Sequence, residues 1–228
     1  HNGYGWDYSG SSNTLELNER IRDFTIRRLK TEVLKELPLK TRSFVPVQMM
    51  GDEKKEYMQS RLDWMARYER YQSGGGMPAG FVLQMLTDLR HVCGRMKVGA
   101  CVQWVIDYNE QTSKPVVIYA HHRDVSQAVE EALIEEGLRV STITGETPSH
   151  KRAENVEEFQ SGDLDALVCS TLAAKEGITL TAADTVIFVE REWVPGWEEQ
   201  AEDRINRIGQ EADTVWATYI SVKGTIDE

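Results

Sequence analysis

The 228-residue sequence predicts an α/β protein with a mainly parallel sheet flanked by helices. From Lys114 onward, short runs rich in β-branched residues alternate with runs of helical length, an order typical of βαβ units. Hydrophobic residues make up 40% of the chain and charged residues 28%, which indicates a folded globular protein and excludes a disordered or collagen-like one.

The first half of the chain is predicted to be mostly helical. Residues 1–13 are rich in Gly, Ser and Asn and predict irregular structure. Apolar residues recur at helical spacing over 15–34, and we expect one helix there that ends before Leu37-Pro38, because a residue before proline disfavours the α conformation. Pro46 cannot donate to a strand ladder, so Phe44–Met49 is expected to form an edge strand. Helices are expected over 52–71, 81–93 and 98–108, with a flexible break at Ser73–Gly76.

The second half carries the alternating pattern. Strands are expected over 116–120, 140–143, 166–169, 186–189 and 215–222, and helices over 125–136, 151–159 and 198–207. We therefore expect three parts: a connecting segment at 1–43, an edge strand with a helical insertion at 44–113, and an α/β lobe at 114–228.

The charge balance argues against a small basic nucleic-acid module, because 26 Lys and Arg face 37 Asp and Glu and give a net charge of -11. Basic residues nevertheless gather in one segment of this acidic chain: Arg20, Arg22, Arg27, Arg28, Lys30, Lys35, Lys40 and Arg42. Charge alone leaves open whether this segment is a solvated helix face or contacts phosphates.

Three cysteines, Cys93, Cys101 and Cys169, form no CxxC pair and are expected to be reduced, mostly buried thiols. No apolar run is long enough to cross a bilayer, and the sequence opens without a signal-peptide pattern. We expect an intracellular protein with no membrane partner, in the cytoplasm of a bacterial or virus-infected cell or in a nucleus.

Several catalytic patterns are missing from the sequence. It contains no GxxxxGK[ST] phosphate-binding loop, no GxSxG and no HExxH. Asp52-Glu53 begins a charged helix instead of ending an apolar strand, so it is a poor candidate for a metal ligand. His121 and His122 follow a strand and are expected to point in opposite directions, and we predict no metal site.

The segment Gln200–Gln210 is the most informative one, because it places Arg204 and Arg207 three residues apart, on one face of the predicted helix. The planar guanidinium group matches phosphate oxygens, and two of them suit stabilisation of charge on a transferring phosphoryl group. From spacing alone, a surface helix whose arginines pair with Glu202 and Asp203 explains the pattern equally simply.

Taken with the rest of the chain, QAEDRINRIGQ at 200–210 resembles motif VI of the Swi/Snf-type helicase superfamily. Other family elements occur in the expected order. These are Lys114–His122 (motif IV), Ile143–Thr147 ("DGxT"), Ser170–Leu180 (motif V), Val186–Pro195 ("WNP") and Lys223–Glu228 ("KGTxD"). Upstream, Arg27–Lys40 is similar to "RRLKxxVxxxLPxK", and Gly5–Asn13 resembles the annealing-helicase subgroup.

The resemblance implies the RecA-like, P-loop-NTPase-type C-terminal lobe of a DNA-dependent ATPase, a DNA translocase or annealing helicase. Motifs I, Ia, II and III are missing from the sequence, so we expect the chain to be the second lobe, cut from a longer protein or encoded separately. ATP and Mg²⁺ would be held mainly by an N-terminal lobe supplied in cis or in trans. This chain alone is expected to be inactive.

The resemblance also assigns roles to residues. Arg204 and Arg207 are the implied catalytic arginine fingers, and Gly177, Thr179 and Gln200 the implied nucleotide contacts. The implied contacts to the DNA backbone, without sequence specificity, are His121, Gly145, Glu146, Thr171, Trp193, Arg27 and Arg28. The alternative is a non-catalytic DNA- or protein-binding module of the same fold.

Overall fold

A computed structural model of the chain describes residues 13–228, without Arg27, Leu29, Gly75, residues 171–176 and the side chain of Thr31. The expectation of irregular structure over 1–12 and the site predictions for Arg27 and Thr171 therefore lie outside the described residues. The chain forms two compact units, residues 1–36 and residues 37–228, and each is described by itself.

The first unit contains two short helices in place of the single helix predicted over 15–34. α1 spans Thr14–Ile21 and α2 spans Lys30–Val33. No residue of α1 is buried, and its residue Arg20 pairs with Glu16 one turn earlier, at 2.6 Å. Helices this short depend on packing against other elements, so apolar spacing without a buried face does not sustain one long helix. The single-helix prediction was wrong for this reason.

The second unit is built on a six-stranded sheet in which all the pairings of the described strands are parallel. The strands are β1 (Leu39–Val47), β2 (Val116–Ala120), β3 (Val140–Ile143), β4 (Ala166–Ser170), β5 (Thr185–Phe188) and β6 (Thr214–Val222). Their order is β1-β6-β5-β2-β4-β3. The predicted parallel α/β architecture is confirmed, and so is an edge strand containing Pro46, although β1 begins five residues earlier than predicted and ends at Val47.

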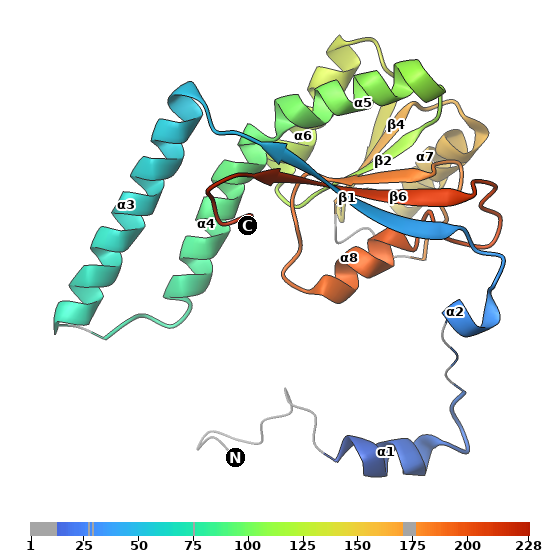
Figure 1. The fold of residues 1–228 in the computed structure, drawn as a ribbon, viewed down its shortest axis with the longest axis horizontal. Helices are drawn as coiled ribbons and strands as arrows, with labels where there is room; N and C mark the ends of the chain where they lie inside the picture. Colours follow the sequence, from blue (N-terminus) through green and yellow to red (C-terminus); the bar gives the residue numbers. More distant parts are fainter. Residues whose placement is uncertain (1–12, 27, 29, 75, 171–176) are drawn as a thin grey trace. The chain divides into compact units, whose positions relative to one another are not determined.

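Helices cover both faces of the sheet. α5 (Val98–Thr112) and α6 (Arg123–Glu135) share one apolar core with the sheet, whereas α7 (Ser149–Ser161) and α8 (Pro195–Glu202) share another with its opposite face. Figure 1 shows α5 and α8 on opposite sides of the β1–β6 pair. Strands with helices on both faces are buried on both sides, which explains why β2 is fully buried along its length.

A row of stacked aromatic rings crosses the sheet on the face that α8 covers. Phe44 of β1 stacks on Tyr219 of β6, Tyr219 on Phe188 of β5, and Phe188 on Tyr119 of β2, with ring centroids 5.5, 4.6 and 5.3 Å apart. These rings join the edge strand β1 to the centre of the sheet, because each stacked pair buries apolar surface between neighbouring strands.

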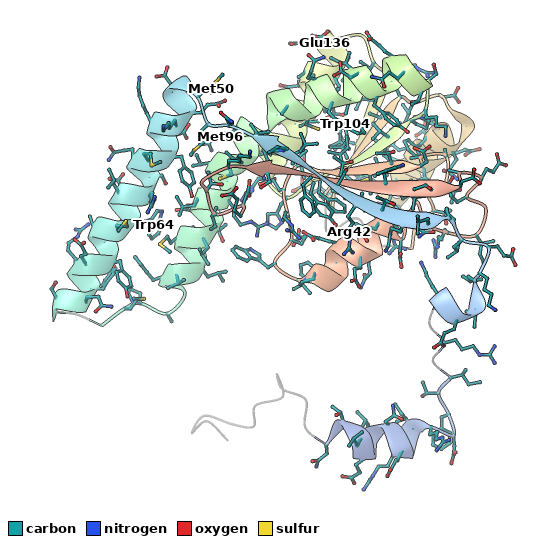
Figure 2. The ribbon with its side chains drawn as sticks, viewed as in Figure 1. Arg42, Met50, Trp64, Met96, Trp104 and Glu136 are labelled. Carbon is teal, nitrogen blue, oxygen red and sulfur yellow. The ribbon has the colours of Figure 1, made fainter. Side chains whose placement is uncertain are left out.

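Of the three helices predicted within 44–113, α3 (Gly51–Gly74) and α4 (Phe81–Met96) form a pair that lies side by side in Figure 1, whereas the third, α5, packs on the sheet. Trp64 of α3, labelled in Figure 2, packs edge-on against Phe81 of α4 at 5.1 Å. A small third core joins this pair to the end of β6 through Tyr57, Leu89 and Val222. The insertion is therefore attached to the sheet at one end.

Two further expectations concern the cysteines and the membrane. Cys93, Cys101 and Cys169 are all free and buried, as predicted, and burial raises the pKa of Cys93 to about 11 and the pKa of the other two thiols to about 12. In the described part of the chain, no helix has the length and apolar character needed to span a membrane.

Candidate functional site

The helix that precedes the two motif VI arginines ends earlier than predicted. α8 stops at Glu202, and the amide of Arg204 donates to the carbonyl of Ala201 in a tight turn. The carbonyl of Arg204 accepts the amide of Leu180 at 2.9 Å, so it is bonded outside the helix. The prediction that Arg204 and Arg207 share a helical face was wrong, because this backbone bond to the Leu180 segment turns the chain out of the helix.

Arg207 joins motif VI to motif V. Its Nη1 donates to the carbonyls of Gly177 and Ile178, each at 3.1 Å, and to Oγ1 of Thr179 at 2.8 Å. All three bonds come from one nitrogen, and within the described part of the chain Nε and Nη2 make no hydrogen bond. The predicted nucleotide residues Gly177 and Thr179 and the predicted finger Arg207 are thus in direct contact.

Arg204 is half-buried beside its like-charged neighbour. Burial lowers the pKa of the Arg204 guanidinium and the positive charge of Arg207 lowers it further, whereas Tyr119 and the carboxylate of Asp203 raise it. Arginine keeps its proton in proteins, so both guanidinium groups stay cationic. Gln200, the remaining predicted nucleotide contact, is exposed on α8.

Glu202 contacts residues of β1 and β6, whereas the sequence interpretation of a surface helix with ion pairs had assigned it to the motif VI arginines. Its side chain is fully buried, and it accepts hydrogen bonds from two cations of β1 and one hydroxyl of β6. Nε and Nη2 of Arg42 lie 2.6 and 2.9 Å from its two oxygens, Nζ of Lys40 lies 2.8 Å away, and the hydroxyl of Tyr219 donates at 2.7 Å. Arg42 lies between β1 and α8 (Figure 2). The alternative in which Glu202 serves the motif VI arginines was therefore wrong.

These contacts also set the ionisation of Glu202. Burial alone would raise the pKa of its carboxyl, but the hydrogen bonds from Arg42, Lys40 and Tyr219 hold that pKa below its usual value. We refer to Glu202, Lys40, Arg42 and Tyr219 as the edge cluster. Two of the eight residues of the basic segment noted in the sequence thus belong to an internal ion cluster.

A second group of charged side chains lies where β2 and β5 end. The backbone amides of His121 and His122 both donate to Oε2 of Glu190 at 2.8 Å, and Nδ1 of His122 lies 2.5 Å from its Oε1. Nδ1 of His121 lies 2.9 Å from Oε1 of Glu192. The two rings are 5.0 Å apart in an edge-to-face arrangement. The expectation that they point in opposite directions was wrong, because β2 ends at Ala120 and both histidines lie beyond the strand.

α4 and α6 complete this group. The His91 ring of α4 stacks on the His122 ring at 4.1 Å, and Nε2 of His91 lies 2.7 Å from a carboxylate oxygen of Asp124 on α6. Gly94 of α4 allows the close approach of the buried carboxylate, because a Cβ there would lie 2.6 Å from Oε1 of Glu190. We call the six residues His91, His121, His122, Asp124, Glu190 and Glu192 the histidine cluster.

The histidine cluster is not arranged as a metal site. Among the described residues, no group of three or more His, Cys, Asp or Glu side chains could hold a metal ion. Instead, each histidine has one carboxylate partner. The hydrogen bond that the His121 ring donates to Glu192 raises the pKa of His121. Burial alone would raise the pKa of Glu190, but its bond with His122 lowers that pKa.

The other predicted DNA contacts lie on exposed segments. Trp193 is 44% exposed, and its ring packs under the guanidinium of Arg90 at 4.2 Å. Gly145 and Glu146 are exposed after β3, where Oε2 of Glu146 pairs with Arg123 at 3.2 Å and the Glu146 amide donates to Oγ1 of Thr144. Arg28 is exposed within the first unit. His121 and Gly145 follow parallel strands and so lie at the same edge of the sheet.

Some site residues escaped the sequence analysis. Glu190 and Glu192 follow one predicted strand, and His121 and His122 follow another. Because the carboxyl ends of parallel strands lie at one edge of a sheet, these residues could have been predicted to lie close together. No comparable local signal marks His91, Lys40 or Arg42, because their partners are on distant elements.

The chain is similar to proteins of known family. Residues 96–209 match the family described as "Helicase conserved C-terminal domain". The mouse protein "DNA annealing helicase and endonuclease ZRANB3" is 36% identical over 223 residues, which are 97% of this chain and 20% of that protein. The Xenopus laevis "SWI/SNF-related matrix-associated actin-dependent regulator of chromatin subfamily A-like protein 1" is 34% identical over 99% of this chain and 23% of its own length. The chain thus spans about a fifth of these relatives.

Solved structures have the same fold. The Sulfolobus solfataricus SWI2/SNF2 ATPase core in complex with dsDNA aligns with a TM-score of 0.70 at 22% identity, over 93% of this chain and 48% of that one. The C-terminal part of the Fun30 ATPase domain aligns with a TM-score of 0.67 at 16% identity, over 84% and 88%. The chain belongs to the helicase conserved C-terminal domain family, in its Swi/Snf-like branch, and is the C-terminal RecA-like lobe.

Proposed function

We propose that this chain is the second lobe of a DNA-dependent ATPase, a DNA translocase or annealing helicase, and that Arg204 and Arg207 contact the nucleotide phosphates. The observation that carries the proposal is the geometry of Arg207. One nitrogen fixes it to residues 177–179, while Nε and Nη2 have no hydrogen bond within the described part of the chain. A guanidinium oriented in this way keeps two donors for phosphate oxygens.

The residues present fit the phosphate end of a nucleotide. Arg207 contacts Gly177 and Thr179, and Arg204 is close enough for the charge of Arg207 to lower its pKa. The sequence has no GxxxxGK[ST] loop, so the triphosphate and Mg²⁺ would be held mainly by an N-terminal lobe in cis or in trans. When bound, ATP would supply the phosphoryl group whose developing charge the two arginines stabilise.

The first test uses a two-lobed protein that contains this chain. We expect Arg204→Ala or Arg207→Ala to reduce ATP turnover by about 10³–10⁵-fold, the contribution typical of arginine fingers. Lysine at either position should also fail, because an ammonium group keeps the charge but loses the planar fork. Thermal unfolding measured alongside separates lost activity from lost structure. Near-normal turnover in both alanine variants would refute the proposal and leave the non-catalytic binding module.

The isolated chain provides a second test. We expect it to hydrolyse ATP at no more than background rate, since the phosphate-binding lysine and the acidic magnesium ligand of the other lobe are missing from its sequence. Robust turnover by the purified chain, abolished by a substitution within it, would contradict the division of labour between two lobes.

For DNA, we propose backbone contacts at the edge of the sheet where β2, β3 and β5 end, through His121, Gly145 and Trp193. Glu192 raises the pKa of His121 and so favours its cationic form, and Arg90 lies against the exposed Trp193 ring. The Glu146 amide is already bonded to Thr144, so at this loop the proposal relies on Gly145. Thr171, Arg27 and Arg28 remain proposed contacts on the family resemblance alone.

Backbone contacts predict weak duplex binding that depends strongly on salt, because each neutralised phosphate adds about 0.9 to the slope of log K against log salt. Tight, sequence-selective binding that is insensitive to salt would contradict the proposal. We also propose an intracellular location, where such a DNA substrate is found. The predicted three-part organisation needs its boundaries moved, because 43/44 falls inside β1 and 113/114 separates α5 from the core that it shares with the sheet.

A further inference from the structure

The edge cluster joins the first strand of the second unit to the turn that carries the two arginines. β1 begins at Leu39, directly after the boundary between the units at residues 36 and 37, and it contributes Lys40 and Arg42. Glu202 is the last residue of α8, two positions before Arg204. The edge cluster therefore attaches β1 to motif VI.

Glu202 is held at both its side chain and its backbone. Its carboxylate accepts Arg42 at 2.6 and 2.9 Å, Lys40 at 2.8 Å and the Tyr219 hydroxyl at 2.7 Å, and its side chain is 1% exposed. Its carbonyl accepts the amides of Ile205 and Asn206 at 3.3 and 3.2 Å. A shift of Glu202 would therefore move the turn that contains Arg204.

The same chain of contacts continues to Arg207. The turn that starts at the Glu202 carbonyl passes through Ile205, whose carbonyl accepts the amide of Arg207 at 3.1 Å. Arg207 then reaches the residue 177–179 segment through Nη1. Residues 203–207 form turns and no regular helix, so helix geometry does not fix their position. The carboxylate of Glu202, which is bonded to β1, fixes it instead.

We propose that Glu202 is a positioning residue for the arginine pair: clamped to β1 by Lys40 and Arg42, it fixes the turn that presents Arg204 and Arg207. The effect of Glu202 on ATP turnover rests on the proposed function. Its effect on the backbone of residues 203–207 does not. Arg42 acts through Glu202, and Lys40 acts through Glu202 and through Asp203, whose Oδ1 lies 3.2 Å from Nζ of Lys40. Loosening the clamp misplaces the guanidinium groups without removing them, so it lowers kcat more than it changes the KM for ATP.

The first arm of the test is hydrogen exchange of the chain itself. Arg42→Ala removes two hydrogen bonds to Glu202 and leaves Lys40 and Tyr219 in place, so the buried carboxylate keeps a cation. We expect the amides of residues 203–210 to exchange about tenfold faster in this variant, with Arg42→Lys in between. Tyr219→Phe removes only the hydroxyl and should give a smaller change in the same segment.

The matched control is Arg139→Ala. Nε and Nη2 of Arg139 lie 3.1 and 2.7 Å from the two oxygens of Asp165, beside β3 and β4 at the other end of the sheet, and its side chain is 55% exposed against 46% for Arg42. This variant removes the same kind of pair far from motif VI, so residues 203–210 should exchange as in the original chain. Unchanged exchange in Arg42→Ala, or equally fast exchange in both variants, would overturn the proposal.

The second arm measures turnover in the two-lobed protein. We expect Arg42→Ala to lower kcat by about 10- to 100-fold with the KM for ATP within about twofold, and Arg139→Ala to leave both unchanged. Local loosening of residues 203–210 with unchanged kcat would overturn the positioning role. If Arg204→Ala and Arg207→Ala themselves keep turnover, the proposed function has failed, and the exchange results still decide whether Glu202 anchors the turn.

Discussion

Two regions of this lobe contain buried carboxylates, which are paired with lysine and arginine in one region and with histidines in the other. In the edge cluster, Glu202 is paired with Lys40 and Arg42, which stay charged at all ordinary pH values. In the histidine cluster, Glu190 and Glu192 are paired with His122 and His121, and histidine is the residue type that can exist as either a neutral or a cationic partner. A buried glutamate is thus paired with lasting cations in the edge cluster and with titratable side chains in the histidine cluster.

The difference has an energetic consequence. Removing the carboxylate from Glu202 leaves Arg42, which cannot become neutral, and takes from Lys40 the partner that offsets its burial, whereas the partner of Glu190 is a histidine. The histidine cluster also relies on two backbone amides that donate to Glu190, while the edge cluster is made entirely by side chains. The predictions below separate these two designs.

The largest effect is expected for neutralising Glu202. We expect Glu202→Gln to lower the free energy of unfolding by about 3 kcal/mol at pH 7.5, because Arg42 and Lys40 lose their buried anion. Glu190→Gln should cost only about 1 kcal/mol, since the amide oxygen still accepts the two backbone amides. Urea unfolding of the isolated chain measures both. Equal costs would show that the titratable partner makes no difference.

Packing around the histidine cluster predicts an effect of about 2 kcal/mol. Gly94→Ala would place a Cβ 2.6 Å from Oε1 of Glu190 and 3.1 Å from Cγ2 of Val125, and we expect it to be destabilising by about that amount. Gly99→Ala is the matched control on α5, where a Cβ meets nothing within 4 Å. It should raise the free energy of unfolding by about 0.5–1 kcal/mol through helix propensity. Stabilisation by both alanines would contradict the close approach of Glu190.

The dependence on pH distinguishes the clusters directly. His121 has a raised pKa in the folded state, so its bond to Glu192 contributes full stability below the unfolded pKa and loses it as pH rises through the folded pKa. We expect the cost of Glu192→Gln to shrink by about 1 kcal/mol between pH 6 and pH 9. The cost of Arg42→Ala should stay constant over this range, because all of its partners keep their charge. A pH-dependent cost for Arg42→Ala would be the contrary result.

Acid should weaken both clusters. The pKa values of Glu202 and Glu190 are lowered in the folded state, so their contributions are present above the unfolded pKa and are lost as pH falls through the folded pKa. Urea unfolding followed downward from pH 6 should therefore show that both variants, Glu202→Gln and Glu190→Gln, approach the stability of the original chain. A gap that stays open in acid would contradict the lowered pKa values.

The smallest effect is expected at an exposed ion pair. Arg123 and Glu146 are 79% exposed and lie 3.2 Å apart, and we expect Arg123→Ala to change the free energy of unfolding by at most about 0.5 kcal/mol. Measured by urea unfolding, this variant gives the baseline against which the buried clusters are compared. If Arg123→Ala lowered the free energy of unfolding by more than Glu190→Gln does, burial would not determine the order of these effects.

Local patterning was enough to predict the elements of the sheet. β2 and β3 have the predicted bounds, because a run of β-branched and apolar residues buried on both faces has a clear signature between turn residues. The parallel arrangement followed from the alternation with helices, and the family followed from motif order. The same patterning failed for residues 15–34, where apolar spacing is present and no residue of α1 is buried.

The sequence by itself therefore determined the fold class and the family, since these depend on local periods and on the order of motifs along the chain. The tertiary structure alone decided where α8 ends and which charges pair. Arg42 and Glu202 are 160 residues apart and meet only because the order of the sheet places β1 beside β6, opposite α8. A charged side chain carries no local signal of its partner, because Coulomb attraction depends on distance in space and not along the chain.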